Sequence, residues 1–172
     1  METVHHYNTD FNFDKRITIS AHTTMDLISL GTRSKYYLVI YGVGLYTYPK
    51  INKISDVYSP NYTKCLQLKF YRSLDYEQIY KAFVEVIEKK VKLSKFSSQL
   101  KQMYNIFKNI KNIEYRDKVE IVWYSDKLEL YYNNVFSGLI VNKDFAKVIF
   151  DCYLDENSIT PDLLQNYTPN SP

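Results

Sequence analysis

The sequence predicts a single α+β domain in which helices pack on one face of an antiparallel sheet. Three observations predict it: period-two apolar runs, helical periodicity at 73–110 and 144–154, and short polar dipeptides between later strands. The chain has 172 residues, which suits one domain with one core. We place that domain at residues 11–166, between a flexible N-terminal tail at 1–10 and a C-terminal tail at 167–172.

The first half of the chain contains three stretches with strand character. Residues 11–20, FNFDKRITIS, alternate between apolar and polar side chains. Residues 36–49 form an apolar run rich in Tyr and β-branched residues, which predicts a strand covered on both faces. A polar connection at 51–63 leads to CLQLKFYR at 65–72, where the strand pattern resumes.

Helical periodicity follows these strands. Ser73 precedes the acidic residues Asp75 and Glu77, so we expect Ser73 to cap a helix whose positive end these carboxylates complement. Apolar residues at spacings of three and four, as far as Val91, predict an amphipathic helix of about twenty residues. A second helix is expected through Ile110.

The last third of the chain returns to period two. The dipeptides Ser125-Asp126 and Asn133-Asn134 separate β-type runs, which makes residues 118–141 a three-stranded meander. Residues 144–154, DFAKVIFDCYL, have one apolar helical face, and a last helical turn is expected after Ser158.

Composition excludes several functions. The net charge of +3 is spread along the chain and the pI is about 8.6, so no nucleic-acid partner is expected. There is no apolar stretch long enough for a transmembrane segment, and no targeting signal is visible, which favours a cytoplasmic or organellar location.

Chemistry-bearing residues are few. The four glycines do not form a phosphate-binding loop, and no cluster of carboxylates has metal-ligand spacing, so no cofactor and no metal are expected. His5 and His6 fall in the expected tail, and His22 has no neighbouring nucleophile, so no catalytic histidine is predicted. Cys65 and Cys152 lie in apolar runs and are interpreted as buried, reduced thiols.

One segment remains as a candidate site, LGTRSKYYLVIYGVGLY at residues 30–46. Gly31 predicts a turn, after which Arg33 begins the next strand. On a straight strand Arg33 and Tyr41 share a face but lie roughly 27 Å apart, too far for one ligand. They meet only if the chain bends back near Ser34 and Lys35. The plainer interpretations are a surface arginine and a core tyrosine.

Gly42 and Gly44 have the opposite parity on the same strand. Since neither carries a side chain, that face is bare, and a helix or a ligand can approach the backbone closely there.

At the candidate segment, residues 30–46, the chain resembles the chalcone isomerase-like family. The similarity is carried by LISLGTRSKYYLVIYGVGLY, CLQLKF, RSLDYEQIYKAF and FSGLIVNKDFAKVIFDCYL in that order, and it covers roughly residues 10–166. It implies an open-faced β-sandwich, in which a large antiparallel sheet and a layer of helices enclose a cleft.

The resemblance also implies a set of site residues. Arg33 matches the arginine that holds the substrate oxyanion in the plant enzymes, which close a flavanone ring by intramolecular addition. Tyr41 occupies the position of their threonine, Tyr76 approximately matches their tyrosine, and Ser137 stands near a later threonine. The helical asparagine has no clear equivalent. An arginine followed eight residues later by tyrosine resembles the non-catalytic, fatty-acid-binding branch.

Three hypotheses follow from this resemblance. The leading one is non-catalytic binding of a fatty acid or similar apolar carboxylate, with Arg33 as anion anchor, Tyr41 as second donor, and Tyr76 and Ser137 as further ligand-binding candidates. No catalytic residue is assigned. The second is an intramolecular lyase acting on a phenolic enone, and the third is a ligand-free scaffold acting through protein contacts.

Overall fold

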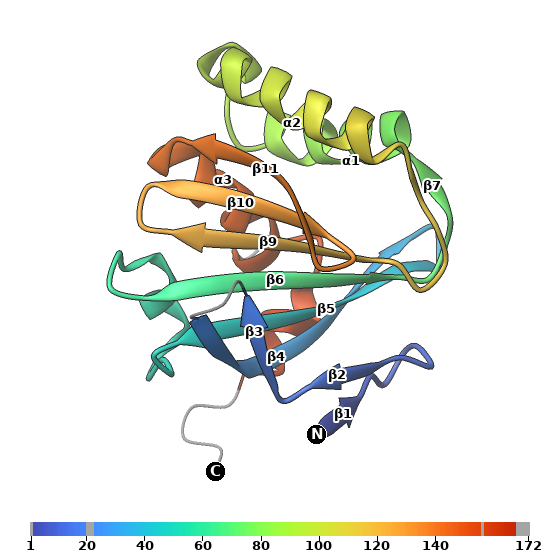
Figure 1. The fold of residues 1–172 in the computed structure, drawn as a ribbon, viewed down its shortest axis with the longest axis vertical. Coiled ribbons are helices and arrows are strands. Elements are labelled where there is room, and N and C mark those ends of the chain that lie inside the picture. Colours follow the sequence, from blue (N-terminus) through green and yellow to red (C-terminus); the bar gives the residue numbers. More distant parts are fainter. Residues whose placement is uncertain (1, 20–22, 156, 168–172) are drawn as a thin grey trace.

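The computed structural model describes residues 2–19, 23–155 and 157–167. A large, curled, antiparallel seven-stranded sheet dominates it, which confirms the α+β class (Figure 1). Its strands, in spatial order, are β11 (Val135–Val141), β10 (Lys127–Tyr132), β9 (Lys118–Tyr124), β6 (Thr63–Phe70), β5 (Leu38–Tyr48), β4 (Thr23–Lys35) and β3 (Arg16–Ile19). Two short pairs accompany it: β1 (Thr3–His5) with β2 (Asn12–Asp14), and β7 (Leu74–Asp75) with β8 (Asn112–Ile113).

The helices cover one face and one end of this sheet. They are α1 (Tyr76–Glu88), α2 (Ser97–Ile110), α3 (Lys143–Leu154) and α4 (Pro161–Gln165), with 3₁₀ turns at Ile54–Tyr58 and Leu93–Phe96. In Figure 1, α1 and α2 lie side by side beyond β11, and α3 lies behind the central strands. The expected meander is confirmed, because β9, β10 and β11 pair in sequence order.

The main core lies between the helices and the sheet. Alternate residues of β5 show the division: Tyr41, Val43 and Leu45 are buried in this core, whereas Gly42 and Gly44 face the opposite side. Trp123 of β9 packs against Phe150 of α3, with ring centroids 5.1 Å apart. The apolar faces predicted for the helices and for the strands therefore meet in one core between the helices and the sheet.

The first helix is shorter than predicted, and its cap differs. Asp75 caps α1 by accepting a hydrogen bond of 2.9 Å from the Gln78 backbone N–H, and the Gln78 side chain accepts from the Asp75 backbone. Ser73 instead donates its hydroxyl to Glu114 at 2.8 Å. The expected helix of about twenty residues ends at Glu88, because the chain turns there before the 3₁₀ segment Leu93–Phe96.

The turn expected at Gly31 is also misplaced. β4 runs without interruption through Gly31 to Lys35, and the chain reverses at Tyr36 and Tyr37, whose φ angles are 52° and 65°. Lys35 and Leu38 are paired across this two-residue loop. Residues 36–37 are therefore an exposed turn rather than the start of the buried strand.

Gly31 is required for another reason, the close approach of α4 to β4. A Cβ atom built at Gly31 would lie 2.8 Å from the Leu163 Cβ atom and 3.1 Å from its Cα atom. The approach is fixed by hydrogen bonds from the Ser29 hydroxyl to Leu163 O, 2.6 Å, and from the Thr32 N–H to Asp162, 2.9 Å.

The Gly31→Val substitution should therefore lower the free energy of unfolding by about 1–3 kcal/mol, because α4 must move as a unit to make room. Urea unfolding followed by circular dichroism measures the change. Ser34→Val, at an exposed position of the same strand, is the matched control and should leave the midpoint nearly unchanged. A Gly31→Val midpoint equal to that of the wild type would show that α4 does not constrain this position.

The N-terminal segment was expected to be a tail, but the structure differs. Thr3–His5 pair with β2, and His6 is fully buried against Gly42, where a Cβ atom would come within 3.1 Å of the imidazole ring. The Nε2 atom of His6 donates to Gly31 O at 2.8 Å, and burial lowers the pKa of the ring, so His6 is a neutral structural residue. The bare strip is thus filled by His6 at Gly42 and by Phe13, Tyr46 and Leu27 at Gly44.

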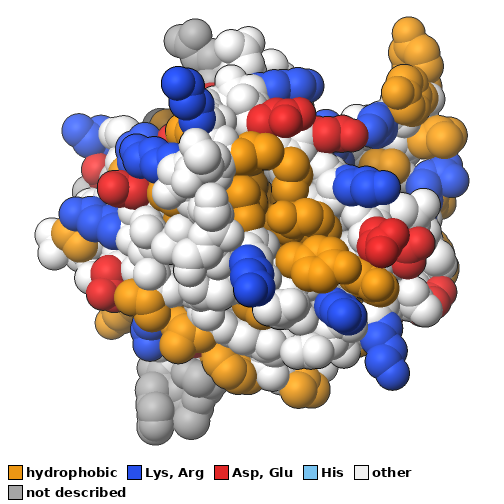
Figure 2. All heavy atoms as spheres, turned by 90° about the horizontal axis from the view of Figure 1, so that it is seen from above, with side chains coloured by type: hydrophobic (Ala, Val, Ile, Leu, Met, Phe, Trp, Pro, Cys, Tyr) orange, Lys and Arg blue, Asp and Glu red, His pale blue; other side chains and the backbone are white. Residues whose placement is uncertain are grey.

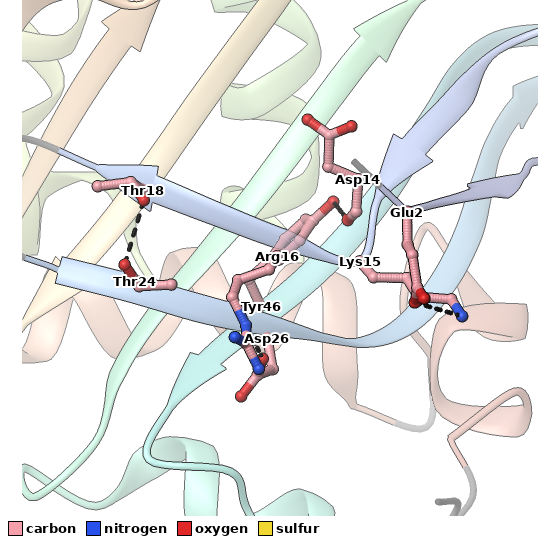
Figure 3. Close-up of polar contacts among 8 residues, drawn as sticks. All are labelled: Glu2, Asp14, Lys15, Arg16, Thr18, Thr24, Asp26 and Tyr46. Atoms are coloured by element: carbon pink, nitrogen blue, oxygen red, sulfur yellow. Dashed lines mark hydrogen bonds and ion pairs between the residues drawn. The ribbon is translucent and has the colours of Figure 1, made fainter.

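The predicted strand at 11–20 is divided in two, because β2 ends at Asp14 and β3 begins at Arg16. Figure 3 shows how this region is held: Arg16 pairs with Asp26 at 2.9 Å, and the Tyr46 hydroxyl donates to Asp14 O at 2.6 Å. The expectation for His22, and that for residues 168–172 of the C-terminal tail, fall outside the described residues.

Candidate functional site

The β4–β5 hairpin brings Arg33 and Tyr41 together. The two residues are direct partners across the strand pair, which corrects the straight-strand separation of roughly 27 Å. The pairing shifts register between Arg33 and Ser34, so that Ile40 is an extra residue on β5. This β-bulge lets Ile40 and Tyr41, although adjacent in sequence, both line one cavity.

The cavity lies between the hairpin, α1 and the end of α3, and its volume is about 280 Å³. Its wall is mainly apolar, formed by Ile40, Tyr41, Phe70, Leu74, Ile79, Ala82, Phe83, Val86, Cys152, Tyr153 and Ile159. The polar members of the lining are Arg33, Lys35, Gln78, Lys81 and Glu85. Since Lys35, Lys81 and Glu85 are exposed to solvent, they mark the mouth of the cavity.

A pair of buried phenols closes the inner end of the site. The hydroxyl oxygens of Tyr41 and Tyr153 are 3.0 Å apart, and both side chains are almost completely buried. Burial raises the pKa of Tyr41 to about 12, an effect that the nearby Arg33 guanidinium opposes. Tyr41 is therefore a neutral hydrogen-bond donor and not a base near neutral pH.

Removing one of these hydroxyls should cost stability. The Tyr41→Phe variant leaves the Tyr153 hydroxyl buried without its partner, which should lower the free energy of unfolding by about 1–3 kcal/mol. The Tyr41→Phe/Tyr153→Phe double variant should lose less than the sum of the two single variants. Urea titrations of all four proteins measure this coupling, with Tyr37→Phe as an exposed control. Strictly additive losses would show that the hydroxyls do not interact.

Arg33 stands apart from the other three arginines. Arg16 pairs with Asp26, Arg116 pairs with Asp10 at 3.1 Å, and the Nε of Arg72 donates to Val39 O at 3.1 Å. Among the residues that the structure describes, no carboxylate or carbonyl lies within hydrogen-bonding distance of the Arg33 guanidinium. A half-buried cation is thus held beside an apolar cavity with no counter-ion from the described part of the chain.

The lining offers little for covalent or acid–base catalysis. Burial raises the pKa of the Cys152 thiol to about 12, so the nucleophilic thiolate is not available near neutral pH. Glu85, the carboxylate in the lining, is paired with Lys35 at 3.4 Å. Within residues 2–19, 23–155 and 157–167 no group of three His, Cys, Asp or Glu side chains is arranged to hold a metal ion.

Charge on the molecular surface is mixed. On the face that carries α1 and α2, Figure 2 shows Lys and Arg side chains interspersed with Asp and Glu around a patch of hydrophobic side chains. This face has no stripe of a single sign, such as nucleic-acid-binding surfaces present. None of the described helices is both long enough and apolar enough to cross a membrane.

Comparison with known proteins identifies the family. The family model described as chalcone isomerase-like matches residues 8–166, which is most of the chain. The chain belongs to the chalcone isomerase-like family. No curated protein sequence matches it. Among solved structures it is similar to a fatty-acid binding protein of Arabidopsis thaliana, with a TM-score of 0.76 and 18% identity over 96% of this chain and 95% of that one. At this identity the similarity establishes the fold.

The four candidate residues of this chalcone isomerase-like protein are not all brought together. Arg33 and Tyr41 line the cavity, whereas Tyr76 and Ser137 do not. Tyr76 opens α1 and packs edge-on against Tyr104 of α2, with ring centroids 5.9 Å apart. Ser137 lies on β11, four strands from β5, and donates its hydroxyl to Val135 O at 3.0 Å.

Sequence reasoning did not select Tyr153, which completes the phenol pair. It lies on the apolar side of the predicted helix at residues 144–154, where it was assigned to the core. The available signal was chemical: a phenol on a buried helix face needs a hydrogen-bond partner, and Tyr41 on a buried strand needs one as well.

Proposed function

We propose that this protein binds a fatty acid, or a similar apolar molecule with one carboxylate, without catalysing a reaction on it. The carboxylate lies against the Arg33 guanidinium, Tyr41 supplies a second hydrogen bond, and the hydrocarbon tail occupies the cavity between the hairpin and α1.

The Arg33 guanidinium, which pairs with none of the described residues, is the observation that supports this proposal most. A cation beside an apolar cavity is costly unless it is solvated or paired, and a ligand carboxylate provides a bidentate partner. Tyr41 is its direct cross-strand neighbour, and a neutral phenol complements the same anion. The relative named as a fatty-acid binding protein has the same fold.

The cavity favours a slender ligand. Its volume of about 280 Å³ is just below the range for small-molecule pockets, roughly 300–1,000 Å³. Its inner wall is apolar and includes Phe70, Ile79 and Phe83, which suits an alkyl chain.

The other two hypotheses receive less support. A scaffold without a ligand predicts a cleft filled by the protein's own side chains, yet a cavity is present beside Arg33. An intramolecular lyase needs a group that removes a proton, and in the described lining the pKa values of the phenols and of the Cys152 thiol are raised, while Glu85 is paired with Lys35.

Mass spectrometry of lipids extracted from the purified protein tests this function. The wild type should carry fatty acid at a substantial molar fraction, and Arg33→Ala, purified identically, should carry much less. If the wild type carries none after purification and binds none in titration, the proposed function fails. Incubation with a chalcone serves as a second arm, in which turnover would instead support the lyase.

A further inference from the structure

The tip of the β4–β5 hairpin is unusual for its exposed aromatic residues. Tyr37 is fully exposed, Tyr36 is 82% exposed, and Leu38, which follows them, is 49% exposed. These three residues, which we call the hairpin tip, project directly beyond Arg33 and Lys35 at the mouth of the cavity. Large apolar side chains that are this exposed are typical of a surface that a binding partner covers.

The backbone at the hairpin tip has a strained conformation at the two tyrosines. Tyr36 and Tyr37 both have positive φ angles, 52° and 65°, in a two-residue turn that strongly prefers Asn or Gly. The same chain makes the equivalent β10–β11 turn with Asn133 and Asn134, at φ angles of 47° and 70°. Bulky residues in this conformation cost stability, and such strain is typical of functional positions.

The charges around the hairpin tip are mainly positive. Arg33, Lys35 and Lys81 contribute to the lining of the cavity, Lys35 and Lys81 at its mouth, and Arg72 reaches the hairpin by donating to Val39 O. The carboxylate in this lining is Glu85, and Lys35 already pairs with it. A partner surface that is apolar at its depth and anionic at its edge would complement both features.

We propose that the hairpin tip docks on an anionic lipid bilayer. Tyr36, Tyr37 and Leu38 enter the headgroup region, where amphipathic aromatic rings are favoured, and the cationic mouth faces the lipid phosphates. This inference rests on the proposed function, because docking places the mouth of the cavity at the surface where an apolar carboxylate is dissolved. A bilayer is favoured over a protein partner because the tip combines amphipathic phenol rings with cationic side chains beside them.

Vesicle co-sedimentation tests this docking. Wild-type protein should bind vesicles that contain phosphatidylglycerol more strongly than vesicles of phosphatidylcholine alone, and added salt should weaken the binding. Tyr36→Asn/Tyr37→Asn, which copies the Asn133–Asn134 turn, should bind about tenfold more weakly or worse. It should also melt at a higher temperature than the wild type, since the turn is relieved of strain.

Two further variants sharpen the test. Leu139→Ser/Val141→Ser removes two exposed apolar side chains from β11, away from the mouth, and should bind vesicles like the wild type. Tyr37→Trp keeps an interfacial aromatic residue, and its emission should shift to shorter wavelength on vesicle addition, against the constant background of the buried Trp123.

The result that overturns docking is equal vesicle binding by the wild type and the Tyr36→Asn/Tyr37→Asn variant, or no vesicle binding by the wild type. The second of these outcomes would assign the hairpin tip to a protein partner. Titration with a soluble fatty acid separates this inference from the proposed function: the double variant should bind that ligand normally whether or not docking occurs.

Discussion

The Arg33→Gln variant is expected to bind a fatty acid about 10- to 100-fold more weakly than the wild type. A hydrogen bond to a charged group contributes roughly 1.5–3 kcal/mol, and glutamine is shorter than arginine and carries no charge. Isothermal titration calorimetry with one soluble fatty acid measures the change. Because Arg33 has no partner among the described residues, its replacement should leave the free energy of unfolding nearly unchanged.

Arg72→Gln is the matched control for this change. Arg72 also lies at the hairpin, where its Nε donates to Val39 O, but it does not line the cavity. The control should therefore alter affinity by no more than a few-fold, through the loss of a nearby exposed charge. Equal losses of affinity in both variants would mean that only the overall positive electrostatic potential near the hairpin matters, and that Arg33 does not contact the carboxylate.

The Ala82→Trp variant is expected to lose most or all fatty-acid binding. Ala82 lies on α1 and lines the cavity, so an indole at this position fills space that the hydrocarbon tail requires. The cavity holds about 280 Å³, and its other walls are packed core residues that move only at a cost. Because Ala82 is exposed to solvent, the fold should tolerate the larger side chain.

Glu88→Trp provides the comparison for the blocked cavity. Glu88 is an exposed residue at the end of the same helix and does not contribute to the lining. Displacement of a fluorescent fatty acid, monitored at a wavelength where tryptophan does not absorb, should show normal affinity for this control. Retained binding in Ala82→Trp would place the ligand elsewhere on the protein.

The regular part of the fold was predictable, because its physical signals are local. The dipeptides Ser125-Asp126 and Asn133-Asn134 interrupt period-two runs, and the β9–β11 meander forms as they indicate. The apolar spacing in residues 144–154 likewise predicted α3 to within one residue at its start. In these segments each signal agrees with the tertiary contacts that the element makes.

The hairpin that forms the site was less predictable, because its turn has no sequence signal. Tyr36 and Tyr37 have the composition of a strand, and nothing local indicates positive φ angles at two tyrosines. The glycine that suggested a turn, Gly31, is needed for the approach of α4, a contact from more than 130 positions away. The pairing of Arg33 with Tyr41 depends on this hairpin, so residue spacing alone gave the wrong separation.

The distribution of the other candidates has a similar cause. Tyr76 was selected by its position at the start of α1, but the direction of its side chain depends on α2, because its ring packs against Tyr104. Tyr153 was missed because its partner Tyr41 lies 112 positions earlier in the chain. Buried polar pairs of this kind are set by tertiary packing, which local periodicity does not describe.

The most direct test compares a fatty acid with the alcohol of identical chain length, on the wild type and on Arg33→Gln, by calorimetric titration. A carboxylate anchored by Arg33 predicts that the wild type prefers the acid by about tenfold or more, and that Arg33→Gln binds acid and alcohol nearly alike. Equal affinity of the wild type for acid and alcohol, or an acid preference that survives in Arg33→Gln, would contradict the assignment of Arg33 as the anchor.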